Sequence, residues 1–146
     1  MHIKSSDNRL IGFWVYWFPV FSYMALIFFL SSRSSFPLSP PDIPYIDKIC
    51  HLVEFAVLGY LLIRAFIHYD NPSLNKYALL LTIVIAVLFG LADELHQLFV
   101  PMRYGDVYDL IFDGLGAVMG GCMALWINQY CLKKREETNG SQSNIF

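Results

Sequence analysis

The sequence predicts an all-α integral membrane protein whose four transmembrane helices pack as an antiparallel bundle. Two observations carry this prediction. First, 56% of the 146 residues are apolar and only 15% are charged, and the mean hydropathy is +0.48. Second, three long stretches contain no Asp, Glu, Lys or Arg, namely 11–30, 77–92 and 114–132. This composition excludes a disordered or nucleic-acid-binding chain, so we expect the lipid bilayer to be its main partner.

Each predicted helix is justified by its length and by the residues that follow it. A helix that crosses the hydrocarbon core needs about 20 residues. The chain offers four such windows, near 11–30, 48–68, 77–97 and 107–129. The segments between them contain the helix breakers Pro, Gly, Ser and Asn. The first window is longer than the apolar region of a signal peptide and no A-x-A site follows it, so we expect an uncleaved helix.

The distribution of Lys and Arg predicts the orientation of the bundle. Seven of these residues fall on one predicted side, namely Lys4, Arg9, Arg64, Lys76, Lys133, Lys134 and Arg135, and three fall on the other, Arg33, Lys48 and Arg103. We therefore expect a multi-pass membrane protein with both termini in the cytoplasm. The predicted regions are a cytoplasmic N-terminus at 1–10, the membrane domain at 11–130 and a disordered cytoplasmic tail at 131–146.

Acidic residues lie inside the predicted spans. The uncharged part of the third window has 16 residues, which make about 24 Å of helix against a core of about 30 Å. This helix must therefore include Asp93 and Glu94. The second window likewise includes His51 and Glu54. The fourth includes Asp109 and Asp113, and all of these residues lie toward the predicted outer end.

Helical periodicity places the acidic residues on the same faces as small residues. Asp47, His51 and Glu54 share a stripe of the second helix, and Asp93 and Gln97 share one with Ala86 and Gly90 in the third. The stripe of the fourth helix contains Asp109, Asp113, Gly116 and Gly120. Small residues at this spacing bring membrane helices together, and carboxylates inside a bilayer need partners or water. We therefore expect a polar pocket inside the bundle, open to the outer face.

The predicted site combines acid, base and ligand-binding groups. The catalytic candidates are His51, Glu54, Asp93, Glu94, Asp109 and Asp113. The ligand-binding candidates are Lys48, Gln97 and Arg103. Structural explanations compete at individual positions: Asp47 and Asp106 are suited to capping helices, Asp93 to pairing with Arg103, and Asp109 and Asp113 to a first helical turn.

The same residues, in order, resemble a known family. Asp47-Lys48-x-x-His51-x-x-x-Phe55, then Asp93-Glu94-x-x-Gln97-Leu-Phe-Val-Pro, Arg103, Asp109 and Gly116 are similar to the VanZ-like family of small bacterial membrane proteins. The resemblance covers about residues 11–130. It implies a four-helix protein of the bacterial plasma (inner) membrane, in a family named for a member linked to teicoplanin resistance. This chain departs from the family pattern at Met102, where Gly is frequent, and at Asp113, where Asn is frequent.

Two classes of function remain open from the sequence. In the first, the pocket binds or modifies an envelope lipid, a lipid-linked precursor or a glycopeptide-related ligand, with carboxylates and His for acid–base work and Arg for a phosphate. In the second, the protein is a non-enzymatic binding, transport or assembly element, and its Gly-rich faces could form a homo-oligomer. The uncharged stretch 114–132 disfavours a proton path through the membrane.

The sequence identifies no cofactor and leaves open whether the protein is an enzyme. Eight acids face three bases on the outer side, so an anionic ligand would be repelled unless a divalent metal were bound. The low-ranking metal candidates are His51, Glu54, Asp93 and His96, with Glu94, Asp109 and Asp113 as further oxygen ligands. No HExxH motif is present. No serine stands out as a nucleophile, because Ser22, Ser31 and Ser32 have no His nearby in the chain.

Overall fold

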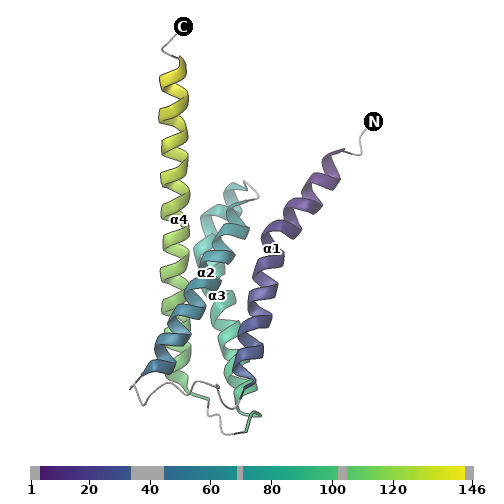
Figure 1. Ribbon diagram of the computed structural model, residues 1–146, viewed down its shortest axis with the longest axis vertical. Helices are drawn as coiled ribbons and strands as arrows, with labels where there is room; N and C mark the ends of the chain where they lie inside the picture. Colours follow the sequence, from purple (N-terminus) through teal and green to yellow (C-terminus); the bar gives the residue numbers. More distant parts are fainter. Residues whose placement is uncertain (1–3, 34–44, 69–70, 102–104, 144–146) are drawn as a thin grey trace.

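The computed structural model describes residues 4–33, 45–68, 71–101 and 105–143. These residues contain four α-helices (Figure 1). These are α1 (Lys4–Ser31), α2 (Ile46–Ile67), α3 (Pro72–Gln97) and α4 (Val107–Ser143). Each contains a segment long and apolar enough to span a membrane, and no strand occurs among the described residues. The structure confirms the predicted all-α fold with four membrane-spanning helices.

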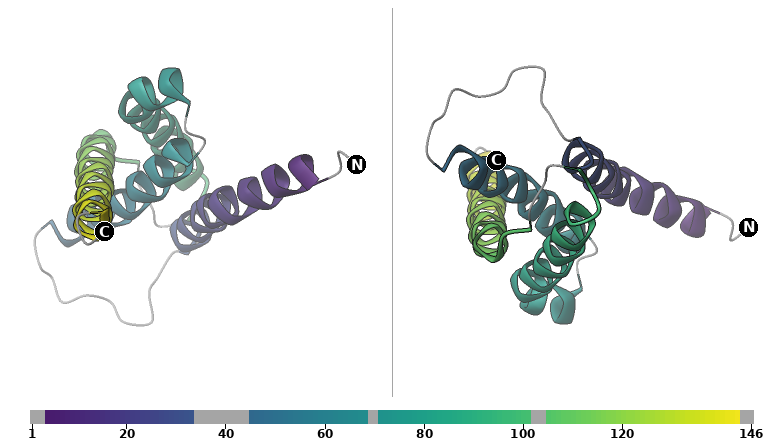
Figure 2. Two further views of the ribbon diagram at one scale, coloured as in Figure 1. Left: turned by 90° about the horizontal axis from the view of Figure 1, so that it is seen from above. Right: turned by 90° about the horizontal axis from the view of Figure 1, so that it is seen from below.

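Successive helices run antiparallel, so the two ends of the bundle differ in character (Figure 1). At one end α1 and α3 finish while α2 and α4 begin, and this is called the carboxylate end because the buried acidic residues lie there. The described ends of α1 and α4 nearest the two chain termini lie at the opposite end. In the side and end views, the N-terminal half of α1 diverges from the other helices (Figures 1 and 2). Among the described residues, α1 contacts α2 and α3 but does not contact α4.

Glycines allow α2 and α4 to approach until their backbones touch. A Cβ atom at Gly116 would overlap the carbonyl oxygen of Leu52, and one at Gly120 would overlap that of Ala56. From the other side, a Cβ at Gly59 would overlap the backbone of Ala117. The contact between α2 and α4 therefore depends on small residues, as the spacing of Gly116 and Gly120 predicts.

The ends of the helices are set by local hydrogen bonds. The Asn71 side chain accepts from the Ser73 and Leu74 amides at 3.0 and 3.3 Å, and Pro72 opens α3, which is a favourable start for a helix. Helix α2 begins differently, because its N-cap Tyr45 has a left-handed backbone and makes no side-chain capping bond to the described residues. The expectation that Asp47 caps α2 is thus wrong, since Asp47 already lies within the first turn.

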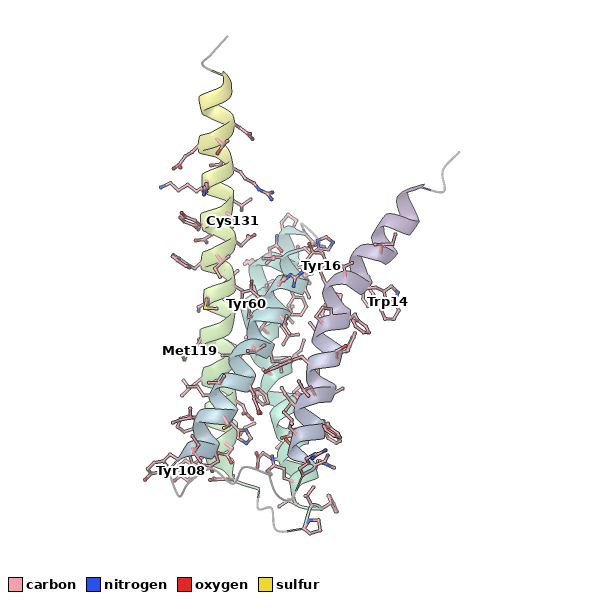
Figure 3. All side chains as sticks on the ribbon, in the orientation of Figure 1. Trp14, Tyr16, Tyr60, Tyr108, Met119 and Cys131 are labelled. Carbon is pink, nitrogen blue, oxygen red and sulfur yellow. The ribbon has the colours of Figure 1, made fainter. Side chains whose placement is uncertain are left out.

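Aromatic and exposed apolar side chains mark the surface that faces lipid. Trp14 lies toward the end of the bundle that carries the termini and Tyr108 lies at the carboxylate end (Figure 3). Leu88 and Trp126 are 61% and 67% exposed. An apolar exposed band bounded by aromatic residues is typical of membrane proteins.

The sequence predicts a disordered tail at 131–146, but helix α4 continues through residues 131–143, so the prediction is wrong for these residues. Lys133, Lys134, Arg135, Glu136 and Glu137 are good helix formers, and they extend a helix that the membrane span has already nucleated. The Thr138 hydroxyl donates to the Lys134 carbonyl within this extension at 2.9 Å.

Candidate functional site

Residues far apart in the sequence meet at the carboxylate end because three helices converge there. Helix α2 contributes from its first two turns, α3 from its last turn, and α4 from its beginning. We call this group the histidine–carboxylate cluster, and it consists of Lys48, His51, Glu94, Asp106, Asp109 and Asp113. Asp109, Asp113 and Glu94 are only 5%, 0% and 8% exposed.

Lys48 links the beginnings of α2 and α4. Its Nζ lies 2.8 Å from Asp106 Oδ2, 3.1 Å from Asp109 Oδ1 and 3.3 Å from Asp47 Oδ2. The hydrogen bond from Lys48 lowers the pKa of the Asp106 carboxyl below its usual value. Asp106 also accepts from the Tyr108 amide at 2.9 Å, so it serves as the cap that the sequence indicated.

His51 is held between two carboxylates of α4. Its Nδ1 lies 2.9 Å from Asp113 Oδ1, and its Nε2 lies 4.0 Å from Asp109 Oδ2. The second oxygen of Asp113 lies against Gly90, where a Cβ atom would overlap it. The glycine in α3 therefore makes room for the carboxylate that orients His51.

Glu94 joins the cluster from α3 and anchors the beginning of α4. Its Oε2 accepts a hydrogen bond from the Asp106 amide at 2.8 Å. Its Oε1 is buried and has no hydrogen-bond partner within the part of the chain that the structure describes. One ligand atom from each of His51, Glu94 and Asp109 lies within 4.8 Å of the others, the one such group of potential metal ligands within the described ranges.

A second polar group lies between α1 and α3, and we call it the serine–aspartate set: Ser31, Asp93 and Gln97. The Ser31 hydroxyl donates to Asp93 Oδ2 at 2.6 Å, and the Gln97 amide donates to the same oxygen at 3.0 Å. Nearby, the Ser32 hydroxyl lies 2.9 Å from His96 Nε2, and His96 stacks on Phe28 with ring centroids 4.1 Å apart.

The predicted site residues therefore separate into two groups. The structure brings together His51, Glu94, Asp109, Asp113 and Lys48, whereas it places Asp93, Gln97 and His96 against α1. Glu54 is half-buried on α2 outside the group of potential metal ligands. Arg103 lies outside the described residues. The functional roles of all these residues stay predictions.

Sequence reasoning missed the polar residues that end α1. Ser31 and Ser32 have no His nearby in the chain, but antiparallel packing puts the last turn of α1 beside that of α3. The signal that could have identified them is their position at the same predicted membrane level as Asp93 and His96.

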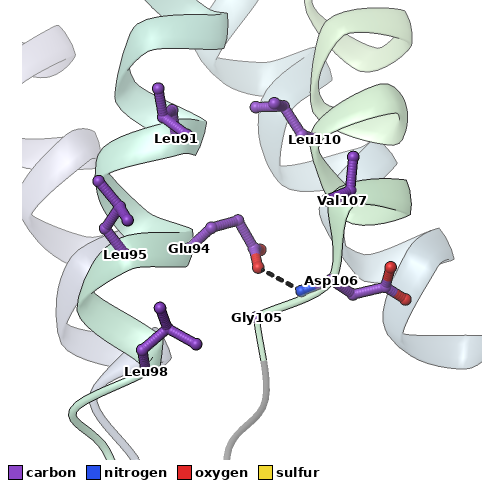
Figure 4. Close-up of a pocket in the computed structure, with 8 residues that line it drawn as sticks. All are labelled: Leu91, Glu94, Leu95, Leu98, Gly105, Asp106, Val107 and Leu110. Carbon is purple, nitrogen blue, oxygen red and sulfur yellow. Dashed lines mark hydrogen bonds between the residues drawn. The ribbon is translucent and has the colours of Figure 1, made fainter.

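A pocket of about 190 Å³ opens beside the cluster, between α3 and α4 (Figure 4). Leu91, Leu95 and Leu98 line one wall, and Val107 and Leu110 line the other. Gly105, Asp106 and Glu94 complete the lining, and Figure 4 shows the Glu94 carboxylate projecting between the two helices. The pocket is thus apolar along its walls and carries one buried carboxylate.

These features define a multi-pass membrane protein whose polar helix ends gather at one level of the bundle. The model of the VanZ/LLP1 family matches residues 5–128, and the chain belongs to this family. No curated protein matches the chain, and no solved structure matches it.

Proposed function

We propose that the carboxylate end binds an envelope lipid or a lipid-linked precursor of the cell envelope. The observation that carries this proposal is the pocket between α3 and α4, whose leucine-lined walls meet the Glu94 carboxylate. A ligand with an apolar chain and a polar head matches both parts of this lining.

The chemistry of the cluster favours a head group that carries hydrogen-bond donors. Ionised carboxylates accept hydrogen bonds only, and none of the described residues donates to Glu94 Oε1. Sugar hydroxyls and peptide amines supply such donors. His51 and Glu94 are the groups we expect to exchange protons with a bound head group, if binding is followed by chemistry.

We place the carboxylate end at the outer face of the bacterial inner membrane. Seven Lys and Arg residues against three support this orientation. In a cysteine-free background, Val107→Cys should react with a membrane-impermeant maleimide in intact cells, and Ser73→Cys should react only after lysis. The reverse pattern would put the pocket on the cytoplasmic side.

The binding proposal is tested by filling the pocket. Leu95→Trp adds bulk to the pocket wall, and Leu88→Trp adds the same bulk to an exposed position two turns earlier on α3 that does not line the pocket. We expect native mass spectrometry to find a co-purified envelope lipid on the parent and on Leu88→Trp, and much less on Leu95→Trp. Equal lipid occupancy in both variants would contradict the proposal and favour an assembly element.

We also propose that this binding contributes to tolerance of glycopeptide antibiotics of the teicoplanin type, which the family membership supports. In a sensitive host, the parent and Leu88→Trp should raise tolerance while Leu95→Trp should not, at matched expression. Arg103→Lys adds a sharper test, because Lys keeps the charge but loses the planar fork that grips a phosphate. If Arg103→Lys retains tolerance, Arg103 contributes its positive charge and not a two-point contact with a phosphate.

A further inference from the structure

Three side chains from three helices offer metal ligands to one point. His51 comes from α2, Glu94 from α3 and Asp109 from α4, and their nearest ligand atoms lie within 4.8 Å of one another. Asp109 is 5% exposed and Glu94 is 8% exposed. Lys48 already compensates Asp109 at 3.1 Å, but a second buried carboxylate beside it remains costly unless another cation compensates it.

Glu94 supplies an independent indication that a ligand is expected here. Its side chain is more than nine-tenths buried, and Oε1 has no hydrogen-bond partner among the described residues. The other oxygen is already occupied by the Asp106 amide, which fixes the orientation of the carboxylate. A buried carboxylate oxygen without a donor is suited to coordinate a cation.

His51 is oriented as histidine ligands of metals are. His51 Nδ1 lies 2.9 Å from Asp113 Oδ1. When Asp113 is ionised and the ring is neutral, the proton lies on Nδ1 and the lone pair lies on Nε2. That nitrogen faces Asp109. A carboxylate behind the ring that fixes the tautomer is the usual outer support of a metal-bound histidine.

We propose that His51 Nε2 and one oxygen each of Glu94 and Asp109 bind a single divalent cation, Zn²⁺ or Mn²⁺. The mixture of one imidazole and two carboxylates favours these ions over Ca²⁺, which takes oxygen ligands only. Two ligand atoms of a tetrahedral zinc ion with bonds of about 2.0 Å are about 3.3 Å apart. The 4.0 Å between Nε2 and Asp109 Oδ2 must therefore shorten by about 0.7 Å, and any pair of ligand atoms as far apart as 4.8 Å must shorten by about 1.5 Å.

The cation would also be accessible to a bound ligand. Glu94 belongs both to this group and to the lining of the pocket. With three protein ligands, the ion keeps positions for water or for a phosphate oxygen. This last step rests on the proposed lipid binding, whereas the metal site itself does not.

The test is zinc binding to the purified full-length chain in detergent, without a histidine tag and after treatment with a chelator. Isothermal titration with Zn²⁺ should show one ion per chain. Asp109→Asn and Glu94→Gln should each weaken binding by about tenfold or more, the loss typical of removed metal-site groups. Asp47→Asn is the matched control, because Asp47 also contacts Lys48 but lies outside the group. No binding at about 1 mM Zn²⁺, or equal losses in Asp47→Asn and Asp109→Asn, would overturn the proposal.

A second measurement uses the unaltered chain, so that it does not depend on how the variants fold. Modification of each histidine by diethylpyrocarbonate is followed by mass spectrometry with and without Zn²⁺. Zinc should slow the modification of His51 and leave that of His68, at the other end of α2, unchanged. Equal rates at His51 with and without zinc would refute the site. The lipid measurement contains no added metal, so the two proposals fail independently.

Discussion

The α2–α4 and α1–α3 interfaces both carry buried polar groups at the carboxylate end, but different kinds of contact form them. Between α2 and α4, glycines let the backbones touch, and the polar groups are a lysine, a histidine and carboxylates. Between α1 and α3, the contacts are a hydroxyl on a carboxylate and an aromatic stack. Only 11% of the most apolar window of α1 is buried, against 39% for α2.

This difference shows which interface fixes geometry and which one can adjust. The glycine contacts permit one separation and one register, so they hold His51 and Asp113 at hydrogen-bonding distance. Helix α1 is held by fewer contacts, at Val20, Ile27 and Ser31 and by Tyr16 stacked on His68 near its other end. We therefore expect substitutions in the first interface to cost more stability than those in the second.

The largest loss of stability should come from removing the positive charge of Lys48 between α2 and α4. Lys48→Met leaves the carboxylate of Asp109, which is 5% exposed, without its partner at 3.1 Å. Breaking a buried pair in this way costs about 3 kcal/mol of unfolding free energy. Denaturant unfolding of the purified protein measures it, and Lys48→Arg should recover most of the loss. A Lys48→Met variant as stable as the parent would show that the ion pair does not contribute to stability.

The next effect concerns backbone contact. Gly120→Ala places a methyl group on the carbonyl of Ala56, whereas Gly114→Ala meets only a side-chain atom of Val87 at 3.7 Å. Overpacking of this kind costs about 1–3 kcal/mol. Unfolding curves of the two variants should therefore separate, with Gly114→Ala close to the parent. Coincident curves would mean that the helices are not in contact at Gly120.

A smaller effect is expected between α1 and α3. Ser31→Ala removes the hydroxyl that donates to Asp93, and such interhelical bonds in membrane proteins average about 0.6 kcal/mol. Ser22→Ala, at an exposed position of the same helix, is the control. The same unfolding assay compares them. A loss for Ser31→Ala as large as that for Gly120→Ala would reverse the ranking of the two interfaces.

The smallest effect should be that of Asp113→Asn on zinc binding. The amide oxygen of Asn can still accept from His51 Nδ1, whereas Asp113→Leu offers no acceptor at 2.9 Å. We expect Asn to change zinc affinity by less than about threefold and Leu to weaken it by about tenfold. If Asn and Leu weaken binding equally, the charge of Asp113 matters rather than its support of the histidine ring.

The sequence alone predicts much of the fold because membrane spans follow from hydropathy. The spans, the antiparallel order and the packing face of Gly116 and Gly120 all follow from composition and helical spacing. Helix ends were less predictable. Tyr45 rather than Asp47 precedes α2, and this depends on backbone geometry that residue preferences do not specify.

The sequence predicted the membrane depth of the candidate site residues, but it did not predict their hydrogen-bond partners. Spacing put His51, Asp93 and Asp109 at one end of the bundle, and they lie there. It could not assign Asp113 to His51 and Asp93 to Ser31, because those pairings depend on how each helix is rotated against its neighbours. That rotation is set by interhelical packing, which a single helix does not encode.

The length of α4 has a consequence at the opposite end of the molecule. Its 37 residues make a rod of about 55 Å, and a bilayer core takes up about 30 Å of it. The remaining turns form a spacer that projects past the other helices (Figure 1). A fluorescent label placed near Ser143 should therefore lie at one height above the membrane. A disordered segment of the same length would instead give a broad distribution of heights.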